Sequence, residues 1–459
     1  MFETIEIPVW AVWLAGILAL IAVLDRILMP TVQWYFHRRL NRTVELLNER
    51  LQLKIPKFKL TDRHVMVDRL VNDPLVVDAI LEESRTEQTP LAVMERRARK
   101  YAREIVPSFS AIGYFGFAFR ATRWLSTLLY NVHVSYQDET ALKDIDAEAR
   151  VVFVMNHRSN MDYILVTYLS ASRSALSYAV GEWARVWPLK QIIRSTGAYF
   201  IRRKSRGDLY RRVLARYVQM ATEGGVAQAI FPEGGLTRTG GLQPAKLGLL
   251  NYIVSDFDPA NHRDILFVPV GVNYDRVIED RVMLDAGQGK RVSLFGKLAA
   301  IFHAIKWYFW LRFVTKFKRF GHAGVSFGKP VSLVEFLGKS KGRVTDRTIG
   351  RLGKELLAKV GDIVPVVPMA LVARVFLRNA STGLTLAEII TESQIELGLL
   401  RDQGALIGLT DAEMEQGITF GIQMLKRRHI LAQSGDKFAL IPDQAEIMQY
   451  YANSLADVG

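Results

Sequence analysis

The chain has 459 residues, 49% of them hydrophobic and 23% charged, a composition typical of a globular protein with room for two or three packed units. It contains no cysteine, which excludes disulfides, thiolate metal sites and cysteine nucleophiles. Lys and Arg number 60 against 46 Asp and Glu, giving a net charge of +14. We therefore expect an anionic partner, either lipid headgroups, nucleic acid or a phosphorylated substrate, with a merely solubilising basic surface as the alternative.

Residues 7–24 read "IPVWAVWLAGILALIAVL" and carry no charge. As a helix this segment is about 27 Å long, close to the roughly 30 Å hydrocarbon core of a bilayer. No Lys or Arg precedes it, and four arginines follow it at positions 26, 38, 39 and 42. The sequence thus predicts a single-pass transmembrane anchor over residues 1–30, with the rest of the chain on the cytoplasmic side. A buried core helix is the alternative.

Residues 31–145 are expected to form a mainly helical N-terminal region. Within it, 114–130 ("YFGFAFRATRWLSTLLY") is interpreted as a core helix, with a membrane-embedded segment as the alternative. The pattern changes over 146–345, where short β-rich runs alternate with helical stretches and predict an α/β domain around a largely buried sheet. The expected strands are 150–155, 198–202, 226–231 and 265–272, and the expected helices are 161–172, 206–222 and 243–256.

Residues 301–320 ("IFHAIKWYFWLRFVTKFKRF") combine aromatic and basic residues, which indicates either a helix in a membrane interface or an ordinary amphipathic packing helix. Residues 346–459 are expected to be mainly helical. Thr385 with Glu388, and Thr410 with Glu413, have the spacing of capping boxes. The end of the chain reads as helix, helix and hairpin, a winged-helix-like tail. Its second helix is acidic at the leading end, where a DNA reader would need cations.

The strand at 150–155 ends abruptly in the polar run "NHRSNMD", which contains His157 and Asp162. The spacing is weak by itself, because His133 and Asp138 share it. His133, however, lies inside an alternating run, whereas His157 follows an apolar strand and precedes a helix, where open α/β sheets bind their ligands. Ser159 and Asp162 also fit a capping box, so Asp162 as a helix cap is the structural alternative.

Other strand ends supply charged residues. Arg202 and Arg203 end the 198–202 strand, although a solvated basic face would explain them equally well. The stretch "FPEGGLTRTGGLQPAKLGLL" follows the next strand and supplies Glu233, Gly234, Thr237, Arg238 and Lys246. It lacks the spacing of a P-loop. Pro269 is expected either on a strand at the edge of the sheet or at a β-bulge.

An imidazole held by a carboxylate can act as a general base, and no Ser or Cys nucleophile motif accompanies this one. Guanidinium groups bind phosphate in a bidentate way. No metal-binding cluster and no nucleotide loop stands out in the sequence. The residues therefore predict activation of a hydroxyl on a phosphorylated substrate, beside a membrane.

Four segments, "NHRSNMDYIL", "GAYFIRR", "FPEGGLTRTG" and "FVPVGVNYDRVIE", resemble in order and spacing the four motif blocks of glycerolipid acyltransferases. The forms HRSxxDYxL and GxxFIRR are more similar to the glycerol-3-phosphate and dihydroxyacetone-phosphate branch than to the lysophosphatidate branch. "RRARKYAREI" and the terminal "YYANS" also resemble bacterial glycerol-3-phosphate acyltransferases. The third block departs from the family pattern at Leu236 and Thr237, where a second arginine and a serine are usual.

The resemblance implies a mixed sheet flanked by helices and a role for each motif residue. His157 would deprotonate the acceptor hydroxyl, and Asp162 would orient the imidazole. Glu233 and Gly234 would shape the acceptor pocket, and Thr237 would be a further substrate-binding residue. The residues implied to hold the acceptor phosphate are Arg202, Arg203, Arg238 and Lys246.

The implied reaction transfers a fatty acyl group from acyl-CoA or acyl carrier protein to the sn-1 hydroxyl of glycerol 3-phosphate. The thioester is a co-substrate, and no cofactor is expected. The implied location is the plasma (inner) membrane, with membrane lipid as a partner and no nucleic acid. Dihydroxyacetone phosphate or lysophosphatidate is the alternative acceptor. A membrane-tethered nucleic-acid-binding or scaffold protein is the alternative from another functional class.

Overall fold

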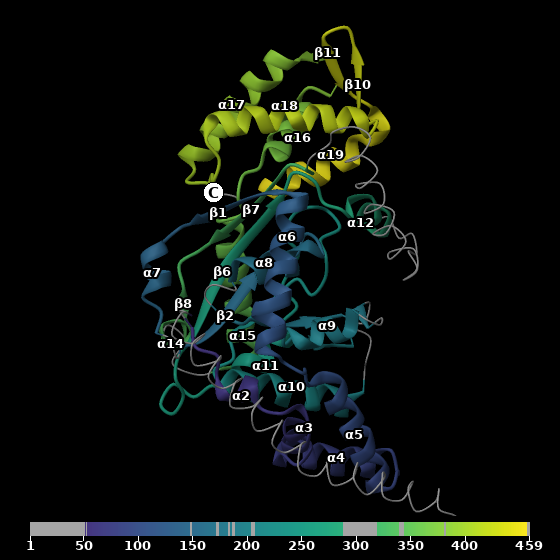
Figure 1. Cartoon of the computed structure of the whole chain (residues 1–459), viewed down its shortest axis with the longest axis vertical. Coiled ribbons are helices and arrows are strands. Elements are labelled where there is room, and N and C mark those ends of the chain that lie inside the picture. The colour runs from purple at the N-terminus through teal and green to yellow at the C-terminus, as the bar shows by residue number, and fades with distance from the viewer. Residues whose placement is uncertain are drawn as a thin grey trace, which may run out of the picture.

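The structure is a computed structural model, and it describes residues 51, 53–146, 149–170, 174–181, 184–185, 189–202, 207–287, 319–338, 344–380 and 382–456 (Figure 1). Within these ranges, no helix has the length and apolar character needed to cross a bilayer. The anchor predicted over residues 1–30 lies outside the described residues, as does nearly all of the 301–320 stretch. Both stay predictions.

An N-terminal group of helices lies at one end of the molecule (Figure 1). It packs against itself and against α10 (Asp208–Glu223), because each helix has one apolar face. In α5, for example, Met94, Ala98, Ala102 and Ile105 are buried at intervals of three or four residues. The helices are α2 (Lys57–Leu60), α3 (Arg63–Val71), α4 (Pro74–Thr86) and α5 (Leu91–Ile105).

A π-helix, η1 (Ile112–Ala118), continues directly into α6 (Phe119–Leu129). The interpretation of 114–130 as a core helix holds for only one of its faces. Tyr114 and Leu129 are buried, but Phe117 and Trp124 are exposed to solvent.

The central sheet has eight strands in the order β1-β7-β6-β2-β5-β3-β4, with β8 pairing to β6 beside β7. β2 runs parallel to β5 and β6, whereas β6 and β7 are antiparallel, so the sheet is mixed as predicted. The strands are β1 (Asn131–Tyr136), β2 (Arg150–Met155), β3 (Ser177–Val180), β4 (Tyr199–Phe200), β5 (Gln228–Ile230), β6 (Ile265–Tyr274), β7 (His322–Phe327) and β8 (Val331–Ser332).

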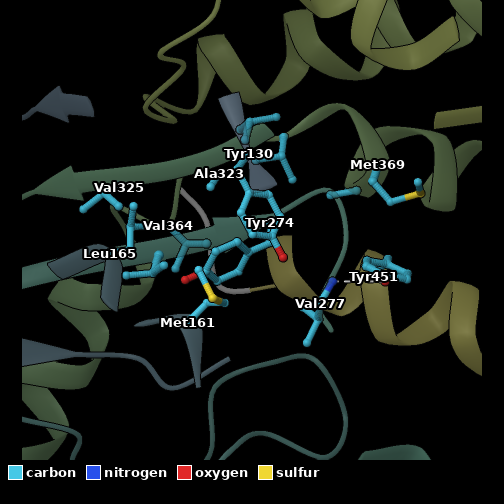
Figure 2. Packing of buried hydrophobic residues seen from close by; sticks show 14 of the residues in the cluster. Tyr130, Met161, Leu165, Tyr274, Val277, Ala323, Val325, Val364, Met369 and Tyr451 are labelled. Carbon is cyan, nitrogen blue, oxygen red and sulfur yellow. Dashed lines mark hydrogen bonds between the residues drawn. The ribbon is translucent and has the colours of Figure 1, made fainter. Parts of the chain in front are cut away.

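Helices cover both faces of the sheet, which explains why β2 is apolar from Val151 to Met155. Its alternate side chains belong to two separate cores. Phe153 and Met155 belong to the core beneath α8 (Met161–Ser170) and α16 (Pro368–Arg378), part of which Figure 2 shows. Val152 and Val154 join the core formed with α10, α11 (Gly248–Val254) and α15 (Asp346–Gly361).

The predicted strands and helices of the α/β region are confirmed, with small differences at their ends. The first strand of the sheet comes earlier in the chain than expected. β1 lies inside the region 31–145, which was expected to be mainly helical, and it pairs in parallel with β7. Pro269 does not lie on an edge strand, because β6 lies between β7 and β2 in the sheet. Pro269 faces Val154 of β2 and lies between the residues of β6 that pair with β8 and those that pair with β7. Its missing N–H therefore falls where the neighbouring strand changes.

The remaining helices are α7 (Glu139–Lys143), α9 (Leu189–Ser195), α12 (Asp280–Gly287), α14 (Leu333–Gly338), α17 (Leu386–Asp402), α18 (Asp411–Arg427), α19 (Ala445–Ala452), η3 (Pro442–Gln444) and η4 (Asn453–Leu455). Both predicted capping boxes, at Thr385 and Thr410, are confirmed. The predicted hairpin is formed by β10 (Leu431–Ser434) and β11 (Lys437–Leu440), which pair with β9 (Leu384–Thr385). The tail thus contains two helices followed by a hairpin, and α19 returns to pack against α16 and α12.

Candidate active site

The polar run after β2 begins with Asn156, whose side chain fixes the end of β2 to the neighbouring strand. Its Nδ2 donates to the carbonyl of Val272 (2.9 Å), and its Oδ1 accepts from the Val272 N–H (2.8 Å). This pair of bonds replaces a ladder hydrogen bond at the point where the chain leaves the sheet. His157 therefore starts from a fixed backbone position.

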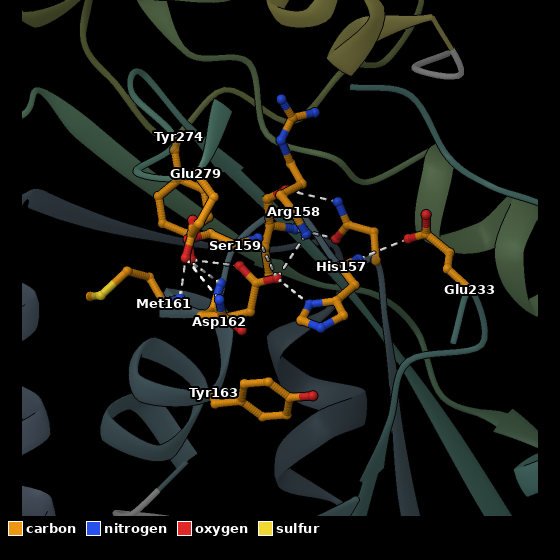
Figure 3. A network of polar contacts seen from close by, with 12 residues as sticks. His157, Arg158, Ser159, Met161, Asp162, Tyr163, Glu233, Tyr274 and Glu279 are labelled. Atoms are coloured by element: carbon orange, nitrogen blue, oxygen red, sulfur yellow. Dashed lines mark hydrogen bonds and ion pairs between the residues drawn. The ribbon is translucent and has the colours of Figure 1, made fainter. Parts of the chain in front are cut away.

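His157 and Asp162 form a buried pair, as the sequence predicts. Nδ1 of His157 lies 2.9 Å from Oδ2 of Asp162, and the two side chains are 3% and 0% exposed. An ionised carboxylate can only accept, so the proton of the neutral imidazole is on Nδ1 and Nε2 is left as the basic nitrogen. The ring lies 4.1 Å from that of Phe231 between centroids. It lies 5.3 Å from the ring of Tyr163, which Figure 3 shows.

Asp162 accepts four hydrogen bonds, which hold its carboxylate in one orientation. Oδ2 also accepts from the N–H groups of Arg158 (2.8 Å) and Ser159 (3.0 Å), and Oδ1 accepts from the hydroxyl of Tyr274 (2.7 Å). The bond to Ser159 is the one that a capping box would make at the start of α8. Asp162 therefore caps the helix and orients His157, so both sequence interpretations apply.

Glu233 fixes the backbone on the other side of His157. Its two oxygens accept from the N–H groups of His157 (2.8 Å) and Gln243 (2.9 Å). Burial raises the pKa of the Glu233 carboxyl to about 7, although both backbone bonds favour its ionised form. The loop from β5 is thereby tied to the loop from β2.

Thr237 shapes the same loop. Its N–H donates to the His157 carbonyl (2.9 Å), and its hydroxyl donates to the carbonyl of Gly241 (2.7 Å). Gly234 has a φ of +64°, which favours glycine, and the side chain of Lys246 lies over it. The Thr237 hydroxyl thus holds the turn of its own loop, and its role as a substrate-binding residue stays a prediction.

Two residues of the site, Tyr274 and Glu279, were missed as individual positions, although both lie in the fourth motif block. Tyr274 ends β6 and supports Asp162. Glu279 accepts from the hydroxyl of Ser159 (2.8 Å) and from Nδ2 of Asn160 (2.9 Å), and burial raises its pKa. Their spacing from His157 in sequence exceeds 100 residues, so no local pattern could assign these partners.

The C-terminal helix α19 packs against the loops that carry the site residues. The Arg158 guanidinium is buried, lies over the ring of Tyr450 (5.4 Å) and contacts the carbonyl of Gly240. Gly240 has a φ of +86° and touches the backbone of Tyr450, while Nδ2 of Asn453 donates to the Thr239 carbonyl (2.8 Å). The terminal "YYANS" segment is therefore part of the wall behind the active-site loop.

The predicted phosphate-binding cations fall into three groups. Arg202 is committed to Glu104, through Nε (2.7 Å) and Nη2 (2.5 Å), and lies between the rings of Tyr101 and Tyr210. Arg203 lies outside the described residues. Arg238 and Lys246 are exposed on the loop that carries Glu233, where a ligand can reach them. Arg202 is thus engaged by Glu104 in this structure, whereas Arg238 and Lys246 are open to a ligand, and phosphate binding by these residues stays a prediction.

His133 and Asp138, which share the spacing of the active-site pair, do not meet as a pair. Asp138 caps α7 by accepting from the Ala141 N–H (2.8 Å). His133 stacks near His322 (5.1 Å between centroids) and lines a separate cleft. Within the described ranges, no group of His, Asp and Glu side chains is arranged to hold a metal ion.

The nucleic-acid alternative predicts a cationic stripe along α18. The first turn of α18 instead carries Asp411 and Glu413, and Arg401 pairs with Asp411. Its last turn is basic, with Lys426 and Arg427, but phosphates at a recognition helix would meet the acidic end. This arrangement does not support DNA reading by the tail.

Two families match the chain. Residues 133–273 match the family described as "Acyltransferase", and residues 309–458 match the "Glycerol-3-phosphate acyltransferase C-terminal region". The first match spans β1 to β6 and contains His157, Asp162 and Glu233. The second contains α19, whose contacts with Arg158 and Gly240 join the two regions at the site.

Several relatives carry the name "Glycerol-3-phosphate acyltransferase". The protein from Ectopseudomonas mendocina is 28% identical over 87% of this chain and 49% of its own length. The protein from Pseudomonas paraeruginosa is 28% identical over 91% of this chain and 52% of its own length. The chain therefore spans about half the length of these relatives.

Among solved structures, the chain is similar to the 1-acyl-sn-glycerophosphate (LPA) acyltransferase PlsC from Thermotoga maritima. The sequence identity is 17%, the TM-score is 0.31, and the alignment covers 53% of this chain and 74% of that one. Both matched regions are thus present in order in this chain, and relatives that carry the name glycerol-3-phosphate acyltransferase align with about nine tenths of it.

Proposed function

We propose that this chain transfers an acyl group from an acyl thioester to the sn-1 hydroxyl of glycerol 3-phosphate, forming lysophosphatidate. The observation that carries the proposal is the buried His157–Asp162 pair. The pair follows the end of β2 and lies inside the matched acyltransferase region. The names of the relatives and the match of the C-terminal region support glycerol 3-phosphate as the acceptor.

In the proposed reaction, Nε2 of His157 takes the proton of the acceptor hydroxyl as its oxygen attacks the thioester carbonyl. Collapse of the tetrahedral intermediate breaks the carbon–sulfur bond, and His157 returns the proton to the departing thiolate. Asp162 stabilises the imidazolium between these two steps. The products are an ester and a free thiol.

The acceptor phosphate would bind outside the carboxyl ends of the strands. Arg238 and Lys246, which are exposed on the loop that carries Glu233, would contact it, and Arg203 is the remaining candidate from the second motif block. Each charge-assisted bond to a phosphate shielded from water contributes about 1.5–3 kcal/mol. The donor is an acyl-CoA or an acylated carrier protein.

We also propose that the chain works at the cytoplasmic face of the plasma (inner) membrane, held by a single-pass anchor over residues 1–30. The support is the uncharged run at 7–24 and the arginines that follow it. The thioester and the product are both amphiphiles, so a reaction site beside a membrane matches their chemistry.

The test is an acyl-transfer assay on the purified full chain, with glycerol 3-phosphate, dihydroxyacetone phosphate and lysophosphatidate offered separately. We expect glycerol 3-phosphate to give the highest kcat/KM. Asp162→Asn should lower kcat without an equal loss in Tm, because it keeps the shape of the cap but removes the charge that supports an imidazolium. A preference for lysophosphatidate would overturn the acceptor assignment, and normal turnover in Asp162→Asn would overturn the mechanism.

A further inference from the structure

One face of the helix that runs from the end of η1 through α6 presents large aromatic side chains to solvent. Phe117 is 64% exposed and Trp124 is 59% exposed. They are seven residues apart, or about two helical turns, so they lie on the same side of the helix, about 10 Å from one another. Isolated exposed apolar residues are common, but two large aromatic residues in register on one helix face form a surface.

Two arginines flank this aromatic pair. Arg120 and Arg123 are exposed, and the described part of the chain places no acidic partner on either guanidinium. The sequence between positions 105 and 137 contains no Asp or Glu at all. We refer to Phe117, Arg120, Arg123 and Trp124 together as the α6 face.

The opposite side of the same helix is packed into the protein. Ser126 and Leu129 are buried, and α6 lies along α8, the helix whose first turn contains Asp162 (Figure 1). A cleft of about 1320 Å³ opens beside Trp124, with Tyr168 of α8 and the exposed Arg319 in its lining. The α6 face is therefore carried by a helix that is firmly seated on the catalytic layer.

We propose that the α6 face docks onto a lipid surface that carries anionic headgroups. Aromatic rings favour the boundary between headgroups and acyl chains, and arginine extends an apolar stem while its guanidinium binds lipid phosphate. Basic residues close to an anionic membrane surface add to the binding by electrostatic attraction. The net charge of +14 acts in the same direction over a longer range.

A second copy of the chain is a less suitable occupant. In a symmetric dimer through this face, Arg120 and Arg123 would oppose their own copies, with no acid on the helix to balance them. A lipid surface has the opposite charge over its whole extent. This docking would place the helix that carries Asp162 one layer from the membrane, beside the amphiphilic substrate and product.

The absence of cysteine makes a direct test practicable in the full chain. Phe117→Cys and Trp124→Cys are made separately and labelled with the environment-sensitive fluorophore NBD. Ile395→Cys is the matched control, because Ile395 is 55% exposed on α17 in the C-terminal region. Each labelled protein is mixed with vesicles of phosphatidylcholine alone or of phosphatidylcholine with phosphatidylglycerol.

With phosphatidylglycerol present, emission at positions 117 and 124 should rise severalfold and shift to shorter wavelength, while emission at 395 stays unchanged. Adding Arg120→Ala and Arg123→Ala to the Trp124→Cys protein should shrink the change and make what remains insensitive to salt. An unchanged emission at both positions would overturn the proposal, and so would an equal response on uncharged vesicles. An emission shift that depends on protein concentration without vesicles would identify a protein interface instead.

Acyl transfer measured on the same labelled proteins in detergent keeps the two proposals separate. A vesicle-dependent signal from a protein that never transfers acyl groups would leave docking intact and refute the proposed function. An active enzyme with no vesicle-dependent signal at position 117 or 124 would refute docking and leave the proposed function intact.

Discussion

The hydroxyl of Tyr274 donates to Oδ1 of Asp162 over 2.7 Å, and this bond leaves Oδ2 of the same carboxylate to His157. Tyr274 ends β6, whereas Asp162 begins α8, so the bond ties the orientation of the catalytic pair to a neighbouring strand. Burial raises the pKa of Tyr274 well above its usual value, and the proximity of Asp162 raises it further, so the hydroxyl stays a donor.

Tyr274→Phe should lower kcat about ten- to a hundredfold, because a hydrogen bond to a charged group contributes about 1.5–3 kcal/mol. The ring itself remains, so its packing against Tyr130, at 5.2 Å between centroids, is retained. Tyr199→Phe is the control. The Tyr199 hydroxyl is buried and bonds to none of the described residues, so its loss should leave both kcat and Tm near the wild type. Equal kcat values for the two variants would refute the role of Tyr274.

His157→Ala should lower turnover about 10²–10⁴-fold with the fold intact, the usual contribution of a positioned general base. His133→Ala removes an imidazole that has the same sequence spacing from an Asp but lies in another cleft. It should cost little activity, and any loss should follow a loss of Tm. The measurements are kcat with saturating substrates and thermal denaturation. Similar activities in the two variants would mean that the wrong histidine has been chosen.

Arg238→Ala should raise the KM for the phosphorylated acceptor about ten- to a hundredfold, corresponding to the loss of one charge-assisted bond of about 1.5–3 kcal/mol. The KM for the thioester should hardly change. Arg202→Ala is the informative comparison, since Arg202 pairs with Glu104. It should lower Tm and leave the acceptor KM nearly unchanged. A raised acceptor KM with an unchanged Tm in Arg202→Ala would show that Arg202 leaves Glu104 when substrate binds.

The raised pKa of Glu233 predicts a particular dependence of stability on pH. Its pKa is about 7 in the folded chain against an ordinary value of 4.5, so the folded state binds the proton more tightly. The resulting stabilisation is complete below about pH 4.5 and is lost as the pH rises through about 7. It amounts to about 3 kcal/mol, at about 1.4 kcal/mol per pKa unit.

Glu233→Gln removes this titration while preserving the size of the side chain. The stability of the wild type relative to Glu233→Gln should therefore fall as the pH is raised from 4.5 to 7.5. Denaturation midpoints of both proteins over this pH range provide the measurement. Parallel curves would mean that the pKa of Glu233 is the same in the folded and the unfolded chain.

Gly240→Ala should displace the active-site loop from α19. A Cβ at this position would lie 1.7 Å from the Tyr450 carbonyl oxygen, and the φ of +86° is itself unfavourable for alanine. Gly404→Ala is matched in backbone conformation, with a φ of +85°, but has open space around it. The control should lose about 1–2 kcal/mol of stability and keep its activity. Gly240→Ala should lose both stability and activity. Full activity in a folded Gly240→Ala protein would contradict the role assigned to α19.

The sequence by itself determined the parts of this protein that depend on local pattern. The apolar run of β2 predicted a strand covered on both faces, and the polar run after it predicted a site at its end. The capping boxes at Thr385 and Thr410 could be read from neighbouring residues, because a cap is completed within four positions of the chain. The resemblance of the motif blocks added the order of the site residues.

Only the tertiary structure decided which distant groups meet. The resemblance of the motif blocks implied Arg202 as a phosphate ligand, yet in the folded chain it pairs with Glu104, 98 residues away. Tyr274 and Glu279 became part of the site because β6 lies beside β2 in the sheet. The pairing of β1 with β7 likewise moved the start of the α/β unit to residue 131. Hydrogen bonds and ion pairs act over a few ångströms in space, so the folded chain selects the partners, whereas local sequence fixes only which side chains are offered.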